Sequence, residues 1–531
     1  MKERAKCSSH YPVVSIIAGF FLIIACDRFL VAALTSSSPS SQLPQFDRQQ
    51  NDPHKILIPS SSSSSSLIIS EGSLRDMEVS STMATKPGST PGFYNPKRRI
   101  GRDVVVLSVA QWLAAETKRR AAKDKVNNLK TGDSSSASSN WTTRPVRLLD
   151  ATSATGIQGL RCMVESPILA NAIMSKNGYE HPNMEDDNVQ NAQNYIQQNI
   201  KDPPELQLVL NDLDPNAVEI TRCNVHSVRE QMMKHEVDSS SNYSNDVNTR
   251  DLMNINITQR VAQAIMHEEA FEVSVLDPFG SVQPFLDAAL SRAPQGGLIE
   301  VCATDVGVLY GSRPSVVSRH YHANLSKRRP PCYRERGVRL LFAAIAQAAG
   351  RHDRGVEPVY GVSTEHFCLV SMRVFRGAKA ADSTVRQVKS VRICRTCGDA
   401  GIGTELDCGC EPIDGAGNNA DEEGPLWIGP LHDLDAVEQM AEIACLEEAK
   451  GFIAPETCDF LQKLKEEAAI QTMFHRRPGV AAEGRTPKLA QVMEELQRRN
   501  FKTARTHFCA KSLKSEASVK EFDAAVKAAI T

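Results

Sequence analysis

The sequence predicts a doubly wound α/β domain followed by a smaller C-terminal α+β domain. Short apolar runs rich in β-branched residues alternate with longer helical segments, which is typical of a mostly parallel sheet covered by helices. Several runs end in an acidic residue and a turn, as strands do where ligands bind at their carboxyl ends. With 531 residues, the chain is long enough for two domains. We expect them at residues 91–376 and 377–531.

Residues 1–90 are expected to lie outside both domains. An apolar run from Val13 to Cys26 follows three basic residues, and Ser-rich sequence fills most of the remainder. The run is short for a membrane-spanning helix and has the length of a signal-peptide core. We interpret 1–90 as a hydrophobic targeting segment and a disordered Ser-rich spacer, with no stable membrane span in the mature protein. The expected location is intracellular, in the nucleus or in an organelle (mitochondrion or plastid).

Charge and cysteine content set two further limits. The formal net charge is −2, so any nucleic-acid partner must be held by local basic patches. Several of the 14 cysteines stand singly on apolar segments, and we expect reduced core thiols, as is usual inside cells. The sequence indicates no obligate protein partner.

The first strand and the turn after it predict a nucleotide-type site. A stiff loop at 91–96 and an apolar helix at 104–115 precede a strand, Val146 to Asp150. Small residues then form a tight turn, and a helix begins at Ile157. Asp150, the turn at Gly156 and the helix N-terminus can surround a nucleotide. Because Gly156 and Gly159 alone do not complete Gly-x-Gly-x-x-Gly, a methyl-donor nucleoside is favoured over NAD.

Two acidic residues further on extend this predicted site. A second strand, 206–210, is followed by Asp212, and an acid at this place typically binds ribose hydroxyls. A helix is expected at 217–229, between polar insertions. Asp251 lies where a third loop would meet the adenine amine.

A third strand ends in Val273-Ser-Val-Leu-Asp-Pro-Phe-Gly-Ser281. Pro278 restricts the backbone beside Asp277, and Gly280 permits an unusual turn. Asp277 is a hydrogen-bond acceptor next to the flat ring of Phe279, a combination suited to holding a base. The alternative interpretation is an ordinary strand end with an acid that caps the next helix.

The remaining pattern completes the sheet. A strand at 297–304 and a helix at 337–349 precede another strand-like segment, 366–374. The late consecutive strand segments predict an antiparallel pair at one edge of the sheet.

Four cysteines in two close pairs predict a zinc site. Cys394 and Cys397 are followed by Cys408 and Cys410 on Gly-containing turns. Such turns direct two thiolates each toward one tetrahedral centre. The alternative is a set of unligated reduced thiols in a flexible loop.

Basic residues predict a nucleic-acid surface. One run lies at 327–329, with Arg334, Arg336 and Arg339 nearby, and the tail from residue 460 carries an excess of Lys and Arg with interleaved aromatics. A solvated helical surface is the alternative. The candidate RNA-binding residues are Lys327, Arg328, Arg329, Arg476, Arg477, Arg498, Arg499 and Arg505.

Taken in order, these motifs resemble the tRNA (guanine-26-N2)-dimethyltransferase family. The matching segments cover about 91–510. They are Phe-Tyr-Asn-Pro at 93–96, Asp-Ala-Thr-Ser-Ala-Thr-Gly-Ile-Gln-Gly-Leu-Arg at 150–161, Asn-Asp-Leu-Asp-Pro-Asn-Ala at 211–217, Leu-Asp-Pro-Phe-Gly-Ser at 276–281, the cysteine cluster, Gly-Pro-Leu-Trp-Ile-Gly-Pro at 424–430 and Ala-Arg-Thr-His at 504–507.

The resemblance implies a Rossmann-like methyltransferase domain that uses S-adenosylmethionine and acts on tRNA. It implies methyl-donor contacts from Arg102, Arg161, Asp212, Asp251 and Leu252, and it places the target guanine among the residues Phe93, Asp277 and Phe279. The expected products are N2-methyl- and N2,N2-dimethylguanosine at position 26. Two alternatives stay open: an amino-methyltransferase that acts on adenine or on another RNA, and a non-catalytic, zinc-containing tRNA-binding protein.

Overall fold

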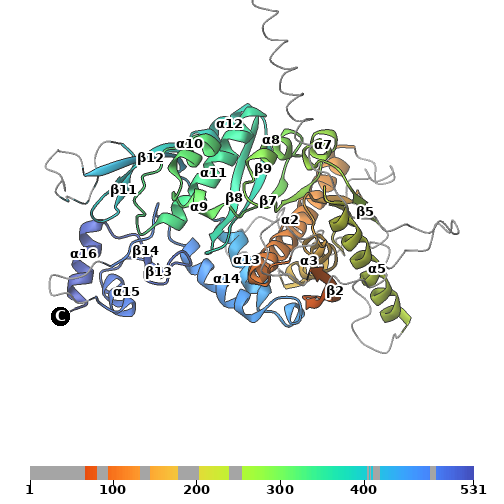
Figure 1. Ribbon diagram of the computed structural model, residues 1–531. Helices are drawn as coiled ribbons and strands as arrows, with labels where there is room; N and C mark the ends of the chain where they lie inside the picture. Colours follow the sequence, from red (N-terminus) through yellow and green to blue (C-terminus); the bar gives the residue numbers. More distant parts are fainter. Residues whose placement is uncertain are drawn as a thin grey trace, which may run out of the picture. The chain divides into compact units, whose positions relative to one another are not determined.

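The structure is a computed structural model. It describes residues 66–80, 94–131, 144–176, 202–237, 254–403, 406, 408, 410, 419–478 and 486–530. The predictions for 1–65, Phe93, Asp251 and Leu252 therefore lie outside the described residues. Residues 61–531 form one compact unit, whose elements are shown in Figure 1.

The central feature is a seven-stranded sheet in the order β5-β4-β3-β6-β7-β9-β8. Its parallel strands are β3 (Val146–Asp150), β4 (Leu206–Asn211), β5 (Ile255–Thr258), β6 (Val273–Leu276) and β7 (Gly297–Ala303). The strands β8 (Arg354–Ser363) and β9 (Cys368–Arg376) are antiparallel and close one edge. The predicted doubly wound sheet and its antiparallel edge are confirmed.

Helices cover both faces of this sheet and bury two hydrophobic clusters (Figure 1). One face carries α2 (Arg99–Thr131), α3 (Ile157–Lys176) and α5 (Pro215–Val237). The other carries α7 (Ala262–Glu268), α8 (Gln283–Ser291) and α11 (Tyr333–Arg351), with the short helices α9 (Val306–Leu309) and α10 (Pro314–Tyr321) beside α11. The helix α2, which begins at Arg99 and continues to Thr131, is longer than the apolar helix predicted at 104–115.

An N-terminal hairpin corrects the prediction that order begins at residue 91. Strands β1 (Ser66–Glu71) and β2 (Leu74–Ser80) pair antiparallel. Leu74 and Met77 are buried in the same cluster as α2 and α3. The hairpin was not predicted because it follows a serine tract, and the two apolar residues described as buried, Leu74 and Met77, have helical rather than strand spacing.

The C-terminal part has its own small sheets. The first joins β11 (Ala400–Gly401), β10 (Val388–Cys394) and β12 (Ala420–Trp427), and the second joins β13 (Thr503–Arg505) and β14 (Leu513–Ser515). Its helical segments are α12 (Ala378–Val385), α13 (Leu434–Ala444), η2 (Glu447–Ala449), α14 (Pro455–Ala468), α15 (Leu489–Arg498) and α16 (Val519–Ala528). Because α13 and α14 share a hydrophobic cluster with α2 and α3, packing continues across the domain boundary predicted at 376/377.

Two cysteines depart from the expectation of reduced thiols. Cys445 follows α13 and forms a disulfide with Cys458 of α14, with a Cα–Cα distance of 5.8 Å. The bridge was not predictable because the two residues meet only when the helices pack. Separately, no helix in the described part of the chain is long and apolar enough to cross a membrane.

Candidate active site

The turn after β3 builds one side of the site. Ala154 and Gly156 have positive φ angles of 50° and 76°. A Cβ at Gly156 would lie 3.1 Å from Thr221, and one at Gly159 would lie 2.5 Å from Leu210. The Thr221 hydroxyl stabilises the turn by donating a hydrogen bond to the carbonyl of Ala154 at 3.0 Å. Small residues are therefore required here, as the sequence predicted.

Asp150 lies at the base of this turn and is buried. Its Oδ2 accepts a hydrogen bond from the Gly159 amide at 3.1 Å, at the start of α3. Burial raises the pKa of Asp150 to about 7, and the nearby charge of Asp277 acts in the same direction. Two of the predicted strand-end acids therefore influence each other electrostatically, as expected when parallel strands end at one edge.

Asp212 lies just after β4 and contacts the same turn. Its Oδ2 accepts from the Ala154 amide at 2.9 Å, and its Oδ1 accepts from the Asp214 amide at 2.9 Å. The neighbouring Leu213 and Val261 are large apolar residues with exposed side chains, after β4 and β5 respectively. Sequence reasoning missed both, although an exposed apolar residue beside a strand-end acid suits an adenine ring.

Asp277 follows β6 and is engaged by a residue that the sequence did not single out. Arg98 Nη1 donates to Asp277 Oδ1 at 2.5 Å, and Arg98 Nη2 lies 2.8 Å from Cys302 Sγ on β7. Phe279, two residues on, is 49% exposed. The acid and the aromatic ring therefore lie at an accessible strand end, which fits the predicted base-holding role rather than an ordinary helix cap.

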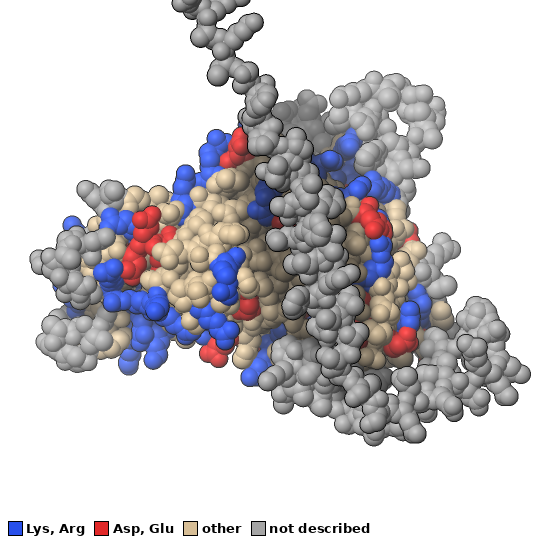
Figure 2. Space-filling view, turned by 45° about the horizontal axis from the view of Figure 1, so that its top comes forward, with Lys and Arg blue, Asp and Glu red and all other residues tan. Residues whose placement is uncertain are grey.

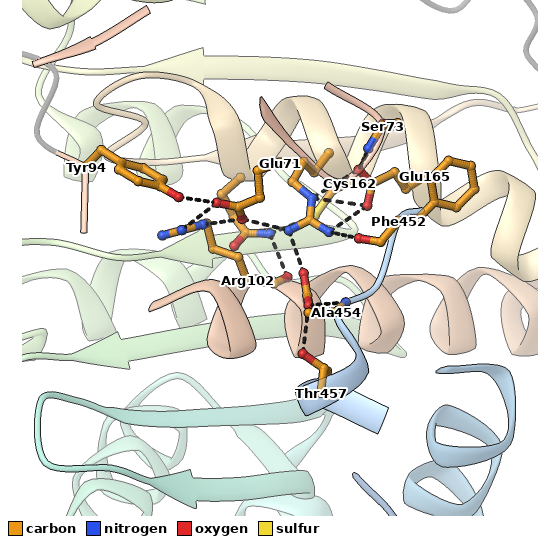
Figure 3. A network of polar contacts seen from close by, with 12 residues as sticks. Glu71, Ser73, Tyr94, Arg102, Cys162, Glu165, Phe452, Ala454 and Thr457 are labelled. Carbon is orange, nitrogen blue, oxygen red and sulfur yellow. Dashed lines mark hydrogen bonds and ion pairs between the residues drawn. The ribbon is translucent and has the colours of Figure 1, made fainter. Parts of the chain in front are cut away.

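Arg102 and Arg161 belong to a buried polar network (Figure 3). Arg102 makes two 2.7 Å hydrogen bonds to Glu71 of the hairpin. The fully buried Arg161 bonds Glu71, Asp103 and Glu165. All three guanidinium nitrogens of Arg161 have protein partners, so Arg161 is bonded within this network in the structure. The resemblance instead implies that Arg161 contacts the methyl donor S-adenosylmethionine.

Glu71 is the shared acceptor in that network. Its carboxylate also accepts from the Tyr94 hydroxyl at 2.6 Å. Burial alone would raise the pKa of Glu71, but the hydrogen bonds and charge of Arg102 and the charge of Arg161 lower it to about 2. The network also reaches the C-terminal part, because Asp103 accepts from the Ala454 amide at 3.0 Å and from Thr457 at 2.7 Å (Figure 3).

The four predicted metal ligands come together. The sulfur atoms of Cys394, Cys397, Cys408 and Cys410 all lie within 4.8 Å of one another. Burial acts to raise the pKa of Cys394, but hydrogen bonds from the Cys397 and Thr396 amides lower it overall. Four clustered thiols, one already biased toward thiolate, fit tetrahedral zinc.

Most of the predicted RNA-binding residues are exposed, and several of them also have protein partners. The exposed ones are Lys327, Arg328, Arg329, Arg477, Arg498 and Arg505. Arg328 donates to the Arg395 carbonyl, and Arg329 donates to the Ser312 hydroxyl. Arg498 and Arg499 pair with Glu495, and Arg476 donates to the Ala517 carbonyl. Figure 2 shows Lys and Arg side chains gathered at the left of the view, the side that carries α15 and α16 in Figure 1.

The basic run near residue 330 needs one correction. Arg336 and Arg339 are buried, not available to phosphate. Arg336 pairs with Glu423 at 2.7 Å, and Arg339 pairs with Glu335 at 2.9 Å. Both arginines stand on α11 and join it to C-terminal segments. Sequence spacing alone could not separate them from the exposed cations.

Sheet order, the small-residue turn and the strand-end acids together define a Rossmann-like domain of the S-adenosylmethionine-dependent methyltransferase class. The sequence profile of the family described as N2,N2-dimethylguanosine tRNA methyltransferase matches residues 74–203 and 196–527. The chain belongs to this family. The predicted resemblance is confirmed.

Individual relatives agree with that assignment. The tRNA (guanine(26)-N(2))-dimethyltransferase of Methanopyrus kandleri is 26% identical over 465 residues, which cover 86% of this chain and 95% of that protein. The tRNA (guanine(27)-N(2))-dimethyltransferase of Mus musculus is 28% identical over 367 residues, covering 67% of this chain. The match spans only 41% of the mouse protein's length.

A solved structure shares the fold. Trm1 from Pyrococcus horikoshii, in complex with S-adenosyl-L-methionine, superposes with a TM-score of 0.58 at 22% identity. The similarity covers 87% of this chain and 99% of that chain. The fold therefore extends over both the central sheet and the C-terminal elements.

Proposed function

We propose that this protein transfers methyl groups from S-adenosylmethionine to the exocyclic N2 of guanine at position 26 of tRNA, giving N2-methyl- and N2,N2-dimethylguanosine. The observation that carries the proposal is Asp277, a carboxylate at a strand end beside the exposed Phe279. The family assignment adds the tRNA substrate and the methyl donor.

The residues around the β3 turn fit the methyl donor. Asp212 is placed to accept the two ribose hydroxyls, while Leu213 and Val261 offer apolar surface to the adenine ring. Arg102, Arg161, Asp251 and Leu252 remain proposed methyl-donor contacts, and Phe93 a proposed guanine contact, from the family resemblance alone. The guanidinium groups of Arg102 and Arg161 are bonded within the buried network in the structure. When bound, the donor supplies a sulfonium methyl group, which is a strong electrophile.

The chain's own contribution is then mainly to orient the amine. The N2 lone pair of guanine is delocalised into the ring, so alignment with the methyl group is the main requirement. Asp277 would accept an amine hydrogen, orient the lone pair and take up the proton as the N–C bond forms. Since a paired base cannot reach a strand end, the guanine would flip out and stack on Phe279.

The acceptor chemistry favours guanine over adenine. Guanine presents two adjacent N–H donors, at N1 and N2, which a carboxylate can accept together. Adenine presents one N–H donor beside the N1 lone pair, which a carboxylate would repel. This difference argues against the alternative of an adenine methyltransferase.

We further propose that the cysteine cluster holds Zn2+ and that the exposed cations among Lys327, Arg328, Arg329, Arg477 and Arg505 contact tRNA phosphates. An intracellular location, in the nucleus or an organelle, follows from a tRNA substrate.

Nucleoside analysis of tRNA treated with the full-length protein and S-adenosylmethionine tests the function. One transcript should carry guanine at position 26 but not at 27, and another at 27 but not at 26, because relatives of both specificities match the chain. We expect N2-methylated guanosine from the first transcript. Methylated adenosine, product from the second transcript alone, or donor binding without product would contradict the proposal.

A further inference from the structure

A short helix places one arginine directly at the proposed base-binding acid. The 3-10 helix η1 (Pro96–Arg98) begins with Pro96, and its N-cap Asn95 accepts from the Lys97 amide at 3.0 Å. The Arg98 amide donates back to the Asn95 carbonyl at 3.1 Å, and Arg102 donates to the same carbonyl at 3.2 Å. The buried network thus anchors the segment that carries Arg98.

The guanidinium of Arg98 spans the ends of neighbouring strands. It bonds Asp277 after β6 and Cys302 on β7, and it lies 5.4 Å from the ring centroid of Phe367, just before β9. Burial would lower the pKa of Arg98, but the charge and hydrogen bond of Asp277, together with Cys302 and the charge of Asp150, outweigh this and raise it above its ordinary value. The side chain therefore reaches Asp277 as a cation.

The fit of Arg98 is incomplete in one respect. Its Nε is buried without a hydrogen-bond partner within the part of the chain that the structure describes. Its ion pair with Asp277 also keeps some access to solvent, with side chains 16% and 24% exposed. An arginine with one unsatisfied donor, next to an accessible carboxylate, can exchange its place with a better-matched group.

Guanine is such a group. Its C2 atom, bonded to N1, N2 and N3, is a cyclic guanidine, so its N1–H and N2–H donors have the same spacing as two N–H groups of an arginine. Arg98 directs one of its N–H groups to Asp277 Oδ1 and another to Cys302, and a guanine edge bonded to both oxygens of Asp277 would need the place that Arg98 Nη1 fills. Adenine lacks this fragment.

We propose that Arg98 is a positioning residue that occupies Asp277 as an internal substitute for guanine and is displaced when the target base enters. This inference rests on the proposed function. Guanine, whose guanidine-like edge can bond Asp277, must displace Arg98 and bears the cost of breaking that pair, whereas adenine has no matching edge and leaves the pair intact.

The test compares tRNA transcripts with guanine or adenine at the target position, bound to full-length protein without methyl donor. The variant is Arg98→Met, and the control is Arg99→Met, an exposed residue next to it with the same charge change. Removal of the internal competitor should raise the guanine-to-adenine affinity ratio about tenfold, equivalent to about 1.4 kcal/mol. The ratio should not change in Arg99→Met.

The same substitution in an Asp277→Asn variant tests whether the effect of Arg98 on the affinity ratio acts through Asp277. In Asp277→Asn protein, adding Arg98→Met should leave the ratio unchanged, since the contested acceptor charge is gone. Arg98→Lys, which keeps the charge but lacks the planar fork, should give an intermediate ratio and serves if the Met variant does not fold.

An unchanged or reduced ratio in the Arg98 variants would overturn the inference, since it would make Arg98 a phosphate contact or a structural group. Methyl transfer by the wild-type protein is measured separately. If the wild type methylates guanine N2 while the ratio does not respond, only this inference fails. If the wild type does not methylate guanine, the proposed function fails on its own result.

Discussion

Glu71 and Arg102 are joined by two hydrogen bonds of 2.7 Å, although they stand on a hairpin and on a helix 31 residues apart in sequence. Both side chains are almost fully buried. A carboxylate that pairs so closely with a guanidinium in the interior is stabilising only while it is charged and its partner is present.

Glu71→Gln tests this pair through its dependence on pH. Because the folded-state pKa of Glu71 is lowered from 4.5 to about 2, its contribution is complete above about pH 4.5 and disappears as pH falls toward 2. Loss of the charge should lower the unfolding free energy at neutral pH by roughly 3 kcal/mol, with a smaller difference from wild type at about pH 3. Urea unfolding at both pH values measures it. Glu268→Gln, which breaks an exposed pair with Arg260, should cost less than about 1 kcal/mol.

Asp212→Ala should weaken methyl-donor binding and leave tRNA binding nearly unchanged. The lost charge-assisted hydrogen bonds to the ribose are worth about 1.5–3 kcal/mol each, so the donor Kd should rise at least tenfold. Calorimetry with S-adenosylhomocysteine measures the change. Glu219→Ala on the following helix removes the same charge from an exposed site and should have no effect. Equal affinity in wild type and Asp212→Ala would remove Asp212 from the donor site.

Asp277→Asn should lower the methylation rate by roughly 100-fold or more, the scale of a lost general base. The asparagine side chain keeps the size and much of the hydrogen-bonding capacity of Asp277, so the affinity for the methyl donor should change little. Single-turnover methylation at saturating donor measures the rate. Phe279→Ala should also weaken capture of the flipped base, because stacking is worth about 1–3 kcal/mol per base. A wild-type rate in Asp277→Asn would mean that another group accepts the amine proton.

Cys394→Ser should lower both the zinc content and the melting temperature. Thiolate ligation couples metal binding to local folding, and Cys394 is the buried member of the four. Elemental analysis and thermal unfolding of the purified proteins measure the two effects. Cys509→Ser removes a free thiol outside the cluster and should keep the zinc. A wild-type protein purified without chelators that holds no zinc would refute the metal site.

Four of the five parallel strands and their acids were predictable because each strand is an apolar run that stops at a polar turn. Asp150, Asp212 and Asp277 needed only that local pattern and the rule that ligands gather at strand ends. The four cysteines were predictable for a similar reason, since both pairs lie on short turns. The fifth parallel strand, β5, alternates apolar and polar residues over only four positions and was not predicted.

Residues whose role depends on a distant partner were not predictable. Lys97, Arg98 and Arg99 form one basic run, yet only the fold directs Arg98 toward Asp277. Arg336 looked like a surface cation until α11 met Glu423, and Arg339 is buried because it also bonds the carbonyls of Trp427 and Gly429. Charge in a sequence does not reveal whether its counter-ion arrives from another element.

The β1–β2 hairpin has a practical consequence for where the polypeptide can be shortened. A recombinant fragment that starts at residue 91, at the first family motif, would lack Glu71 and leave Arg102 and Arg161 buried without their shared counter-ion. Such a fragment should be poorly soluble or unfold early, whereas one that starts before Ser66 keeps the pair intact. The same boundary would constrain a processing protease: a cut upstream of Ser66 preserves the folded enzyme, and a cut downstream of Ser80 removes part of its interior.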